Sequence, residues 1–299
     1  MDLHGFLIVD KPRGVTSHDV VALVRRRLRM RRVGHAGTLD PAASGVLVVA
    51  AGAATRLIDR VQDGDKQYIA HIVLGAETDS ADAEGRLVAT APEDVSAPSL
   101  AIIEQALRSF VGTISQIPPA YSAIKVGGQA LYHRARRGEQ VEVPARTVTV
   151  HAIRILAYAY PDLLVVIDCG KGTYVRSIAR DLGRELGTGA YLHALLRTAV
   201  GPFTLGQAWT ADEIEAYLEP RTWPLMALHP DVALSPTPAL ILDRDAATAW
   251  YHGRPVPTGR QPPRAAIEAR IYDQDGSWLG VATADPERRR WRPRQVVAR

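Results

Sequence analysis

Prolines interrupt the chain repeatedly after Phe203. No long helix or central strand can pass through such a stretch, because proline lacks a backbone donor and fixes its own φ. The prolines stand at positions 220, 224, 230, 236 and 238 of the 299 residues, and short strand-like segments follow, among them ALILD, AAIEARIYD and SWLGVATA. The pattern predicts one large domain over residues 1–230 and a small β domain over residues 231–299.

Strand-like and helix-like segments are mixed before this connector. Apolar runs and alternations predict strands over residues 7–9, 46–49, 68–74 and 163–169. Helices are predicted from Ser17 and from Ser99, each as an N-cap, and a third helix ends at Gly187. The apolar side of the second helix is expected to hold Ile102, Ile103, Leu107 and Phe110. Residues 33–45 and the long excursion over residues 115–147 are predicted loops.

A single cysteine, Cys169, limits the chemistry of the chain. One thiol makes neither an internal disulfide nor a paired zinc or redox motif, and the sequence carries no paired-histidine motif. A reducing, cytoplasmic location and no catalytic metal are therefore expected. The first residues lack a basic-then-apolar leader, and the longest apolar run, Val46 to Ala54, is too short to span a bilayer, so no membrane attachment is expected.

The positive charge of the chain is small but unevenly placed. The net charge is +4, yet arginines cluster within residues 25–32 and 288–294. Such clusters favour a nucleic-acid partner because they neutralise phosphates, although they also serve to keep a surface soluble. Only four of the 36 basic residues are lysines, and they lie in the segments VDKPRG, DKQY, SAIKVGG and CGKGTYVR. Lysine is either required at these places or an accident of biased composition.

The segment GHAGTLDP places Asp40 on a loop flanked by glycines, where a large ligand can approach the backbone. One interpretation is a functional carboxylate, and the other is an Asp-Pro step that merely begins a turn. A carboxylate acting as nucleophile or base must be ionised, and an arginine such as Arg176 would keep it so. The segment around Arg176, GKGTYVR, is no Walker loop, since a valine stands where the first glycine would be.

Acidic side chains gather in the turn-rich segment ETDSADAEG. Asp79, Asp82 and Glu84 lie within it, but their spacing fits no calcium loop. A solvated turn is the preferred interpretation.

Five longer segments occur together and in order between residues 5 and 203. They are GFLIVDKPRGVTSHDVV, RRVGHAGTLDPAASGVLVVAAGAATRL, DKQYIAHIVLGAETDSADAEG, IPPAYSAIKVGGQALYHRARRGE and CGKGTYVRSIARDLG. They closely resemble the TruB family of bacterial tRNA pseudouridine-55 synthases, and a run as long as GHAGTLDPAASGVL is far more specific than a three-residue motif. The resemblance implies an α+β pseudouridine synthase fold, in which helices flank a mostly antiparallel sheet, and a small PUA-like β domain after it.

The resemblance also implies roles for individual residues. Asp40 matches the family's catalytic aspartate, Tyr68 the aromatic residue that packs on the target base, and Arg176 the partner of the aspartate. Residues 115–147 match an RNA-clamping insertion. RNA contacts are implied for Lys11, His35, Lys66, Lys125, Lys171 and Leu196, the last of which is otherwise a plain core leucine.

The carboxy-terminal domain matches the family only loosely. Trp278 and Trp291 lie among arginines in this domain. They either stack on RNA or belong to the domain core.

The implied reaction breaks the bond between uracil N1 and ribose C1′, turns the base and rejoins it through C5. It requires no redox cofactor, metal or ATP. The implied substrate is the T-loop uridine of tRNA, so the expected partner is the T-arm and the expected state is a monomer. The base must first leave its stack, at a cost of roughly a few kcal/mol. Two alternatives stay open: a guide-RNA-dependent pseudouridine synthase subunit with the same motifs, and a non-catalytic tRNA-binding or folding protein.

Overall fold

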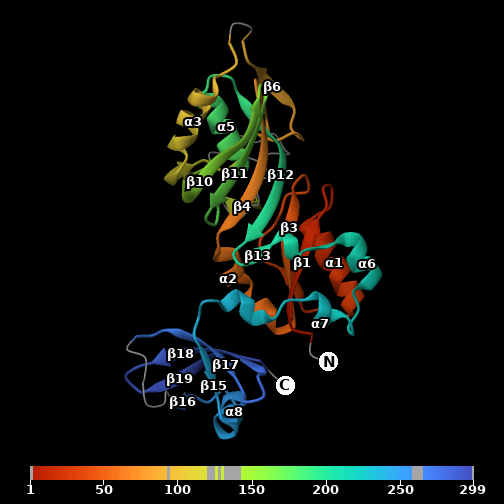
Figure 1. Cartoon of the computed structure of the whole chain (residues 1–299), viewed down its shortest axis with the longest axis vertical. Helices are drawn as coiled ribbons and strands as arrows, with labels where there is room; N and C mark the ends of the chain where they lie inside the picture. Colours follow the sequence, from red (N-terminus) through yellow and green to blue (C-terminus); the bar gives the residue numbers. More distant parts are fainter. Residues whose placement is uncertain are drawn as a thin grey trace.

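The computed structural model describes residues 3–92, 95–119, 125–126, 129–130, 143–257 and 265–297. Within these residues, a ten-stranded sheet runs through most of the molecule and a five-stranded sheet forms a lobe at the carboxy-terminal end (Figure 1). Helices flank the large sheet, which confirms the predicted α+β class with a small β domain. None of the described helices is both long and apolar enough to cross a membrane.

The large sheet consists of two halves that meet at β12. In spatial order its strands are β14 (Trp209–Thr210), β1 (Gly5–Lys11), β3 (Ser44–Ala51), β12 (Ala190–Val200), β4 (Lys66–Leu74), β11 (Asp162–Cys169), β10 (Arg146–Ala159) and β7 (Gly112–Gln116), with β13 (Phe203–Thr204) beside β12 and β2 (Val33–His35) beside β3. β12 pairs in parallel with β3 and antiparallel with β4. All four predicted strands are present, each slightly longer than predicted.

A glycine permits the two halves to join. Gly45 on β3 has a φ of +99°, and a Cβ there would lie 2.3 Å from the carbonyl O of Arg197 on β12. That distance is shorter than any real Cβ contact, so a side chain at this position would push β3 and β12 apart.

The first helix, α1 (Ser17–Leu28), begins with a different cap from the one predicted. Thr16 is the N-cap: its hydroxyl accepts from the backbone N of Asp19, and the Asp19 carboxylate accepts from the backbone N of Thr16, which forms a capping box. Ser17 is buried and instead exchanges hydrogen bonds with the backbone of Leu39, at 3.0 and 3.1 Å. The prediction of Ser17 as N-cap is therefore wrong, because Ser17 holds the Asp40 loop.

Arginines at the end of α1 are largely engaged by the protein itself. Arg25 donates to the Val33 carbonyl O at 2.6 Å, and Arg27 donates to the Leu218 carbonyl O at 2.9 Å. Arg26 forms an ion pair at 2.7 Å with Glu215 of α6 (Ala211–Tyr217). Much of this basic cluster therefore packs α1 against its neighbours.

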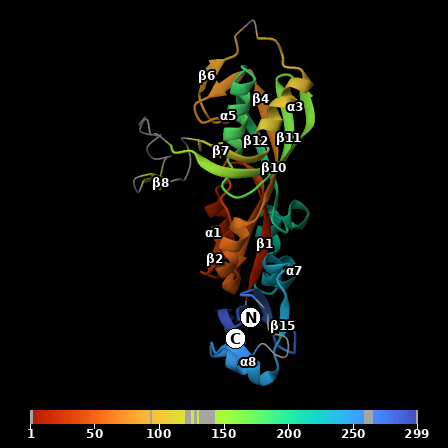
Figure 2. The ribbon, with the colours of Figure 1, turned by 90° about the vertical axis from the view of Figure 1, so that its left-hand side faces the viewer.

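Two helices cover one face of the second half of the sheet. Ser99 caps α3 (Leu100–Ser109) as predicted, and Ile103 and Leu107 are buried, but Ile102 is 54% exposed and does not share their side. α5 (Val175–Glu185) buries Val175, Ile178, Ala179 and Leu182 on the same core, and Gly187 follows it with a φ of +68°. Both helices lie over β4, β10 and β11 in Figure 2.

Shorter elements complete this part. They are η1 (Gly52–Leu57), α2 (Ile58–Asp63), β5 (Ala76–Thr78), β6 (Leu87–Thr90), β8 (Lys125–Val126), β9 (Gln129–Ala130), η2 (Leu205–Gln207), α7 (Trp223–Met226) and η3 (Pro230–Leu234). The predicted loop over residues 33–45 begins with β2 and ends with the first two residues of β3, so that prediction holds only for residues 36–43. Most of the predicted excursion over residues 115–147 lies outside the described residues, and β10 already begins at its end.

The small sheet has its own core. Its strands in spatial order are β15 (Ala239–Ile241), β17 (Glu268–Tyr272), β18 (Trp278–Asp285), β19 (Arg290–Val296) and β16 (Val256–Pro257), and α8 (Arg244–Tyr251) packs beside them. Trp250 and Trp291 are buried in this core, and Trp278 is buried against the large domain. The core interpretation is therefore confirmed for Trp291, whereas Trp278 is buried in the contact between the small sheet and the large domain. Both rings are closed to RNA bases.

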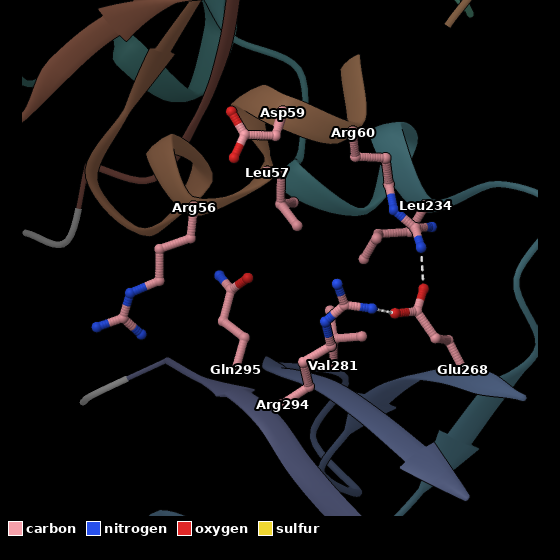
Figure 3. Close-up of a pocket in the computed structure, with 9 residues that line it drawn as sticks. All are labelled: Arg56, Leu57, Asp59, Arg60, Leu234, Glu268, Val281, Arg294 and Gln295. Atoms are coloured by element: carbon pink, nitrogen blue, oxygen red, sulfur yellow. Dashed lines mark hydrogen bonds and ion pairs between the residues drawn. The ribbon is translucent and has the colours of Figure 1, made fainter. Parts of the chain in front are cut away.

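An ionic cluster fastens the small sheet to the large domain (Figure 3). Glu268 of β17 accepts from Arg60 of α2 and from Arg294 of β19 beside a cavity of about 200 Å³. Nearby, Gln295 Nε2 donates to the Ala53 carbonyl O at 3.1 Å, and Arg56 Nη1 donates to the Val296 carbonyl O at 2.9 Å. This interface thus combines polar contacts with the apolar contact made by Trp278.

Candidate active site

Asp40 lies in the loop between β2 and β3, where the two halves of the sheet meet. The backbone N of Ala43 donates to the Asp40 carbonyl O at 3.0 Å, and the backbone N of Gly14 donates to the Pro41 carbonyl O at 2.8 Å. The Asp40 side chain nevertheless stays 52% exposed. The Asp-Pro step therefore begins a turn, and the carboxylate points out of that turn and remains accessible.

Arg176 is the ion-pair partner of Asp40. It is the second residue of α5, and its Nη2 lies 2.8 Å from Asp40 Oδ2, while its own side chain is only 9% exposed. A nearly buried guanidinium thus meets a half-exposed carboxylate. The guanidinium orients the Asp40 carboxylate, which keeps a surface that a ligand can reach.

Asp82 is a second partner of Arg176 that sequence reasoning missed. Its Oδ2 lies 3.2 Å from Arg176 Nη1, and its side chain is 15% exposed. Its Oδ1 accepts from the Ser80 hydroxyl and from the backbone N of Glu84. The predicted solvated turn is wrong for Asp82, because residues 81–83 dock on Leu192 of β12 through backbone hydrogen bonds. In the sequence, the only feature that pointed to Asp82 was its place in a polar turn of the segment DKQYIAHIVLGAETDSADAEG.

A cavity of about 120 Å³ opens beside this ion pair. It contains all three predicted catalytic residues, and its lining consists of Thr38, Leu39, Asp40, Tyr68, Thr173, Tyr174, Val175, Arg176 and Leu195. Burial raises the pKa of Tyr68, although the charge of Arg197 opposes this, so the phenol is protonated at neutral pH. The site therefore combines a carboxylate, a guanidinium and a neutral aromatic ring around one small space.

The leucine that lines the cavity is Leu195 rather than the predicted Leu196. Leu195 is paired with Ala70 of β4 and packs on the core cluster that includes Tyr68, whereas the Leu196 side chain lies against Gly45 of β3. Successive side chains of a strand point to opposite faces, so a shift of one residue changes the face. Leu196 therefore lies on the side away from Tyr68.

The Lys11 ammonium binds backbone carbonyl groups instead of facing solvent. Its side chain is fully buried, and its ammonium donates to the carbonyl O atoms of Pro12, Val15 and Pro41 at 2.9, 2.7 and 3.3 Å. Burial lowers the pKa of Lys11, while the charge of Asp40 raises it. With all three donors occupied, Lys11 ties the turn after β1 to the Asp40 loop, and a direct RNA contact would require these bonds to break.

Lys66 has a similar role at the end of α2. Its ammonium donates to the carbonyl O atoms of Gln62 and Gly64, and burial lowers the pKa of Lys66. Lys171 differs, because it is 66% exposed and pairs with Asp63 at 2.9 Å, so its charge faces solvent. Lys125 lies in β8, and its side chain falls outside the described part of the chain.

His35 stands on β2 beside His18, with the ring centroids 5.5 Å apart. Burial lowers the pKa of His35, and the charges of His18 and Arg197 lower it further, so its imidazole is neutral at neutral pH. It does not line the cavity around Asp40. Throughout the described residues, no three His, Cys, Asp or Glu side chains form a metal-binding group.

Family models match almost the entire length of the chain. The TruB family pseudouridylate synthase N-terminal domain matches residues 25–175, the tRNA pseudouridylate synthase B C-terminal domain matches residues 176–227, and the pseudouridine synthase II TruB C-terminal domain matches residues 238–297. The last match covers most of the small sheet.

Several known proteins are similar over nearly their whole length. A tRNA pseudouridine synthase B from Gloeobacter violaceus is 46% identical over 289 residues, which cover 95% of this chain and 96% of the relative. Its counterpart from Trichormus variabilis is 45% identical over 284 residues, which cover 93% and 94%. Among solved structures, a chain of an H/ACA ribonucleoprotein bound to a substrate RNA containing 2′-deoxyuridine matches with a TM-score of 0.72 and 23% identity, over 99% of this chain and 85% of that chain. This last likeness shows the shared fold.

Proposed function

Because the chain belongs to the TruB family and is a tRNA pseudouridine synthase, we propose that it isomerises the T-loop uridine at position 55 of tRNA and that Asp40 is its essential carboxylate. The observation that carries the proposal is the ion pair between Asp40 and Arg176 at the mouth of the cavity that also contains Tyr68. Asp40 stays accessible while Arg176 is buried behind it, as a reaction on an extruded nucleotide requires.

In this proposal Asp40, Arg176 and Tyr68 have separate roles. Arg176 fixes the orientation of the Asp40 carboxylate, because a guanidinium binds a carboxylate with defined geometry. The Tyr68 ring stacks on the flipped uracil, which offsets part of the cost of extrusion. In the reaction the N1–C1′ bond breaks, the C5–C1′ bond forms, the hydrogen at C5 leaves as a proton, and N1 ends protonated. In this proposal the sugar and base of that nucleotide enter beside Asp40.

The structure changes how we assign the proposed RNA contacts. We keep Lys171 as a phosphate contact because its ammonium faces solvent beside the segment that carries Thr173 and Arg176. For Lys11 and Lys66 we propose a structural role in holding the loop of Asp40 and the end of α2. The domain boundary at residue 230, the monomeric state and the cytoplasmic location remain predictions.

The test uses a tRNA transcript with tritium at uridine C5, because the isomerisation releases that hydrogen to water. We expect the wild-type chain to release tritium without guide RNA, added metal or cofactor. A transcript with cytidine at the T-loop position should release no tritium. Asp40→Asn should abolish release while tRNA affinity stays within a few fold. An active Asp40→Asn variant would refute the proposed role of Asp40.

The same assay separates the alternatives. Release that depends on an added guide RNA would identify a guide-dependent subunit. Binding of tRNA without any release would indicate a folding or binding protein. Relatives 45–46% identical that are named tRNA pseudouridine synthase B favour the guide-free enzyme.

A further inference from the structure

Arg197 occupies the position where the two halves of the large sheet meet. Across β12 it lies opposite Tyr68 of β4 on one side and opposite Gly45 of β3 on the other. It is therefore placed between the strand that carries the aromatic residue of the cavity and the strand that follows the Asp40 loop. Arg197 does not itself line the cavity.

The Arg197 side chain is almost completely buried, at 2% exposure, and it donates to three backbone carbonyl groups. Nε donates to the Val46 carbonyl O at 2.7 Å, Nη2 to the Gly37 carbonyl O at 3.0 Å and Nη1 to the Thr38 carbonyl O at 3.4 Å. Gly37 and Thr38 belong to the loop that presents Asp40 two residues later. Along the described chain, no Asp or Glu lies within ion-pair distance of Arg197.

Burying a charge without a carboxylate partner costs folding free energy, so the presence of Arg197 at this position requires a compensating role. The charges around the cavity indicate what that role is. Asp40 and Asp82 share the single cation Arg176, while Arg197 and Lys11 lie beneath the loop and bind carbonyl oxygens. Burial lowers the pKa of Arg197, but the Tyr68 hydroxyl and the Asp40 carboxylate raise it, so both groups lie within its electrostatic reach.

We propose that Arg197 is a positioning residue, which fixes Asp40 relative to Tyr68 by holding the Gly37 and Thr38 carbonyl groups against β12. The proposal rests on the proposed role of Asp40. Three fixed donors on one planar group set the height of the loop above the sheet, and lysine cannot reproduce them because its single nitrogen sits on a flexible stem. A displacement of about 1 Å at a reacting group is enough to cost roughly a hundredfold in rate.

The test compares Arg197→Lys with Arg270→Lys. Arg270 of the small sheet is a matched control because its Nε likewise donates to a backbone carbonyl, the Thr237 O at 2.9 Å, although its Nη1 also binds Asp231 at 3.3 Å. Single-turnover tritium release and the Kd for tRNA are measured for both folded variants, together with Tm. We expect Arg197→Lys to slow release by about 10- to 100-fold with Kd changed less than about twofold. Arg270→Lys should lower Tm without slowing release.

A neutral variant, Arg197→Gln, covers the case in which buried lysine prevents folding, since its amide donates to one carbonyl without an unpaired charge. Wild-type release from folded Arg197→Lys or Arg197→Gln overturns the proposal. So does a weaker Kd with an unchanged rate, or a failure of both variants to fold, which would assign Arg197 to sheet stability. Inactive Asp40→Asn with normal Arg197 variants refutes only this inference, whereas active Asp40→Asn refutes the proposed function itself.

Discussion

The replacement Asp82→Asn tests whether the second partner of Arg176 matters for catalysis. Asp82 Oδ2 lies 3.2 Å from Arg176 Nη1, and its Oδ1 accepts from Ser80 and from the backbone N of Glu84. Asparagine keeps one acceptor oxygen for the turn and presents an NH2 group to Arg176. The turn is therefore preserved, while an attractive contact becomes a donor facing a donor.

The expected magnitude follows from the burial of this pair. Both side chains are at most 15% exposed, so solvent screens the contact weakly, and a hydrogen bond between charged groups contributes about 1.5–3 kcal/mol. If that energy orients Arg176 against Asp40 in the transition state, each 1.4 kcal/mol lost slows the reaction about tenfold. We expect single-turnover tritium release to fall about 10- to 100-fold, with the Kd for tRNA nearly unchanged.

The control variant is Asp79→Asn in the same turn. Asp79 accepts from the backbone N of Arg86 at 2.9 Å and pairs with its Nε at 3.1 Å, a contact whose arginine is 90% exposed. Asp79→Asn should change the rate of tritium release less than about twofold, since exposed ion pairs contribute little to stability. Asp82→Asn with a rate equal to that of Asp79→Asn, in protein of normal Tm, would refute the shared-arginine argument.

Three further predictions concern Arg176 and Cys169. Arg176→Lys should slow release at least as much as Asp82→Asn, because one ammonium cannot bind Asp40 and Asp82 in the same geometry; near-normal turnover would show that the ion pair is dispensable. Burial raises the pKa of Cys169 to about 11, so the thiol should resist iodoacetamide at pH 8 and react only after unfolding in guanidinium. The same raised pKa means that ionisation of Cys169 should destabilise the fold as pH rises above about 9, which thermal unfolding from pH 8 to 10 would detect. Rapid alkylation of the native chain would contradict this burial.

The sequence identified the main residues of the site because they lie in long contiguous motifs. Asp40 follows glycines on a loop before an apolar run, Tyr68 stands in an alternating strand, and Arg176 opens an amphipathic helix. The lysines in these motifs were also recognised as distinctive, but their role was interpreted from the expected RNA partner. The structure shows Lys11 and Lys66 bound to backbone carbonyls, because both ammonium groups are turned into the protein.

Local patterns alone predicted four strands of the large sheet, the Ser99 cap of α3, the turn at Asp40 and a small β domain after the large one. Tertiary structure decided which side chains meet. Asp82 and Arg176 are 94 positions apart, and only the docking of a turn on β12 brings them together. Irregular pairing along β12 between Leu192 and Ala194 decides that Leu195, rather than Leu196, faces Tyr68. Such contacts depend on register and distant packing, which a linear pattern does not encode.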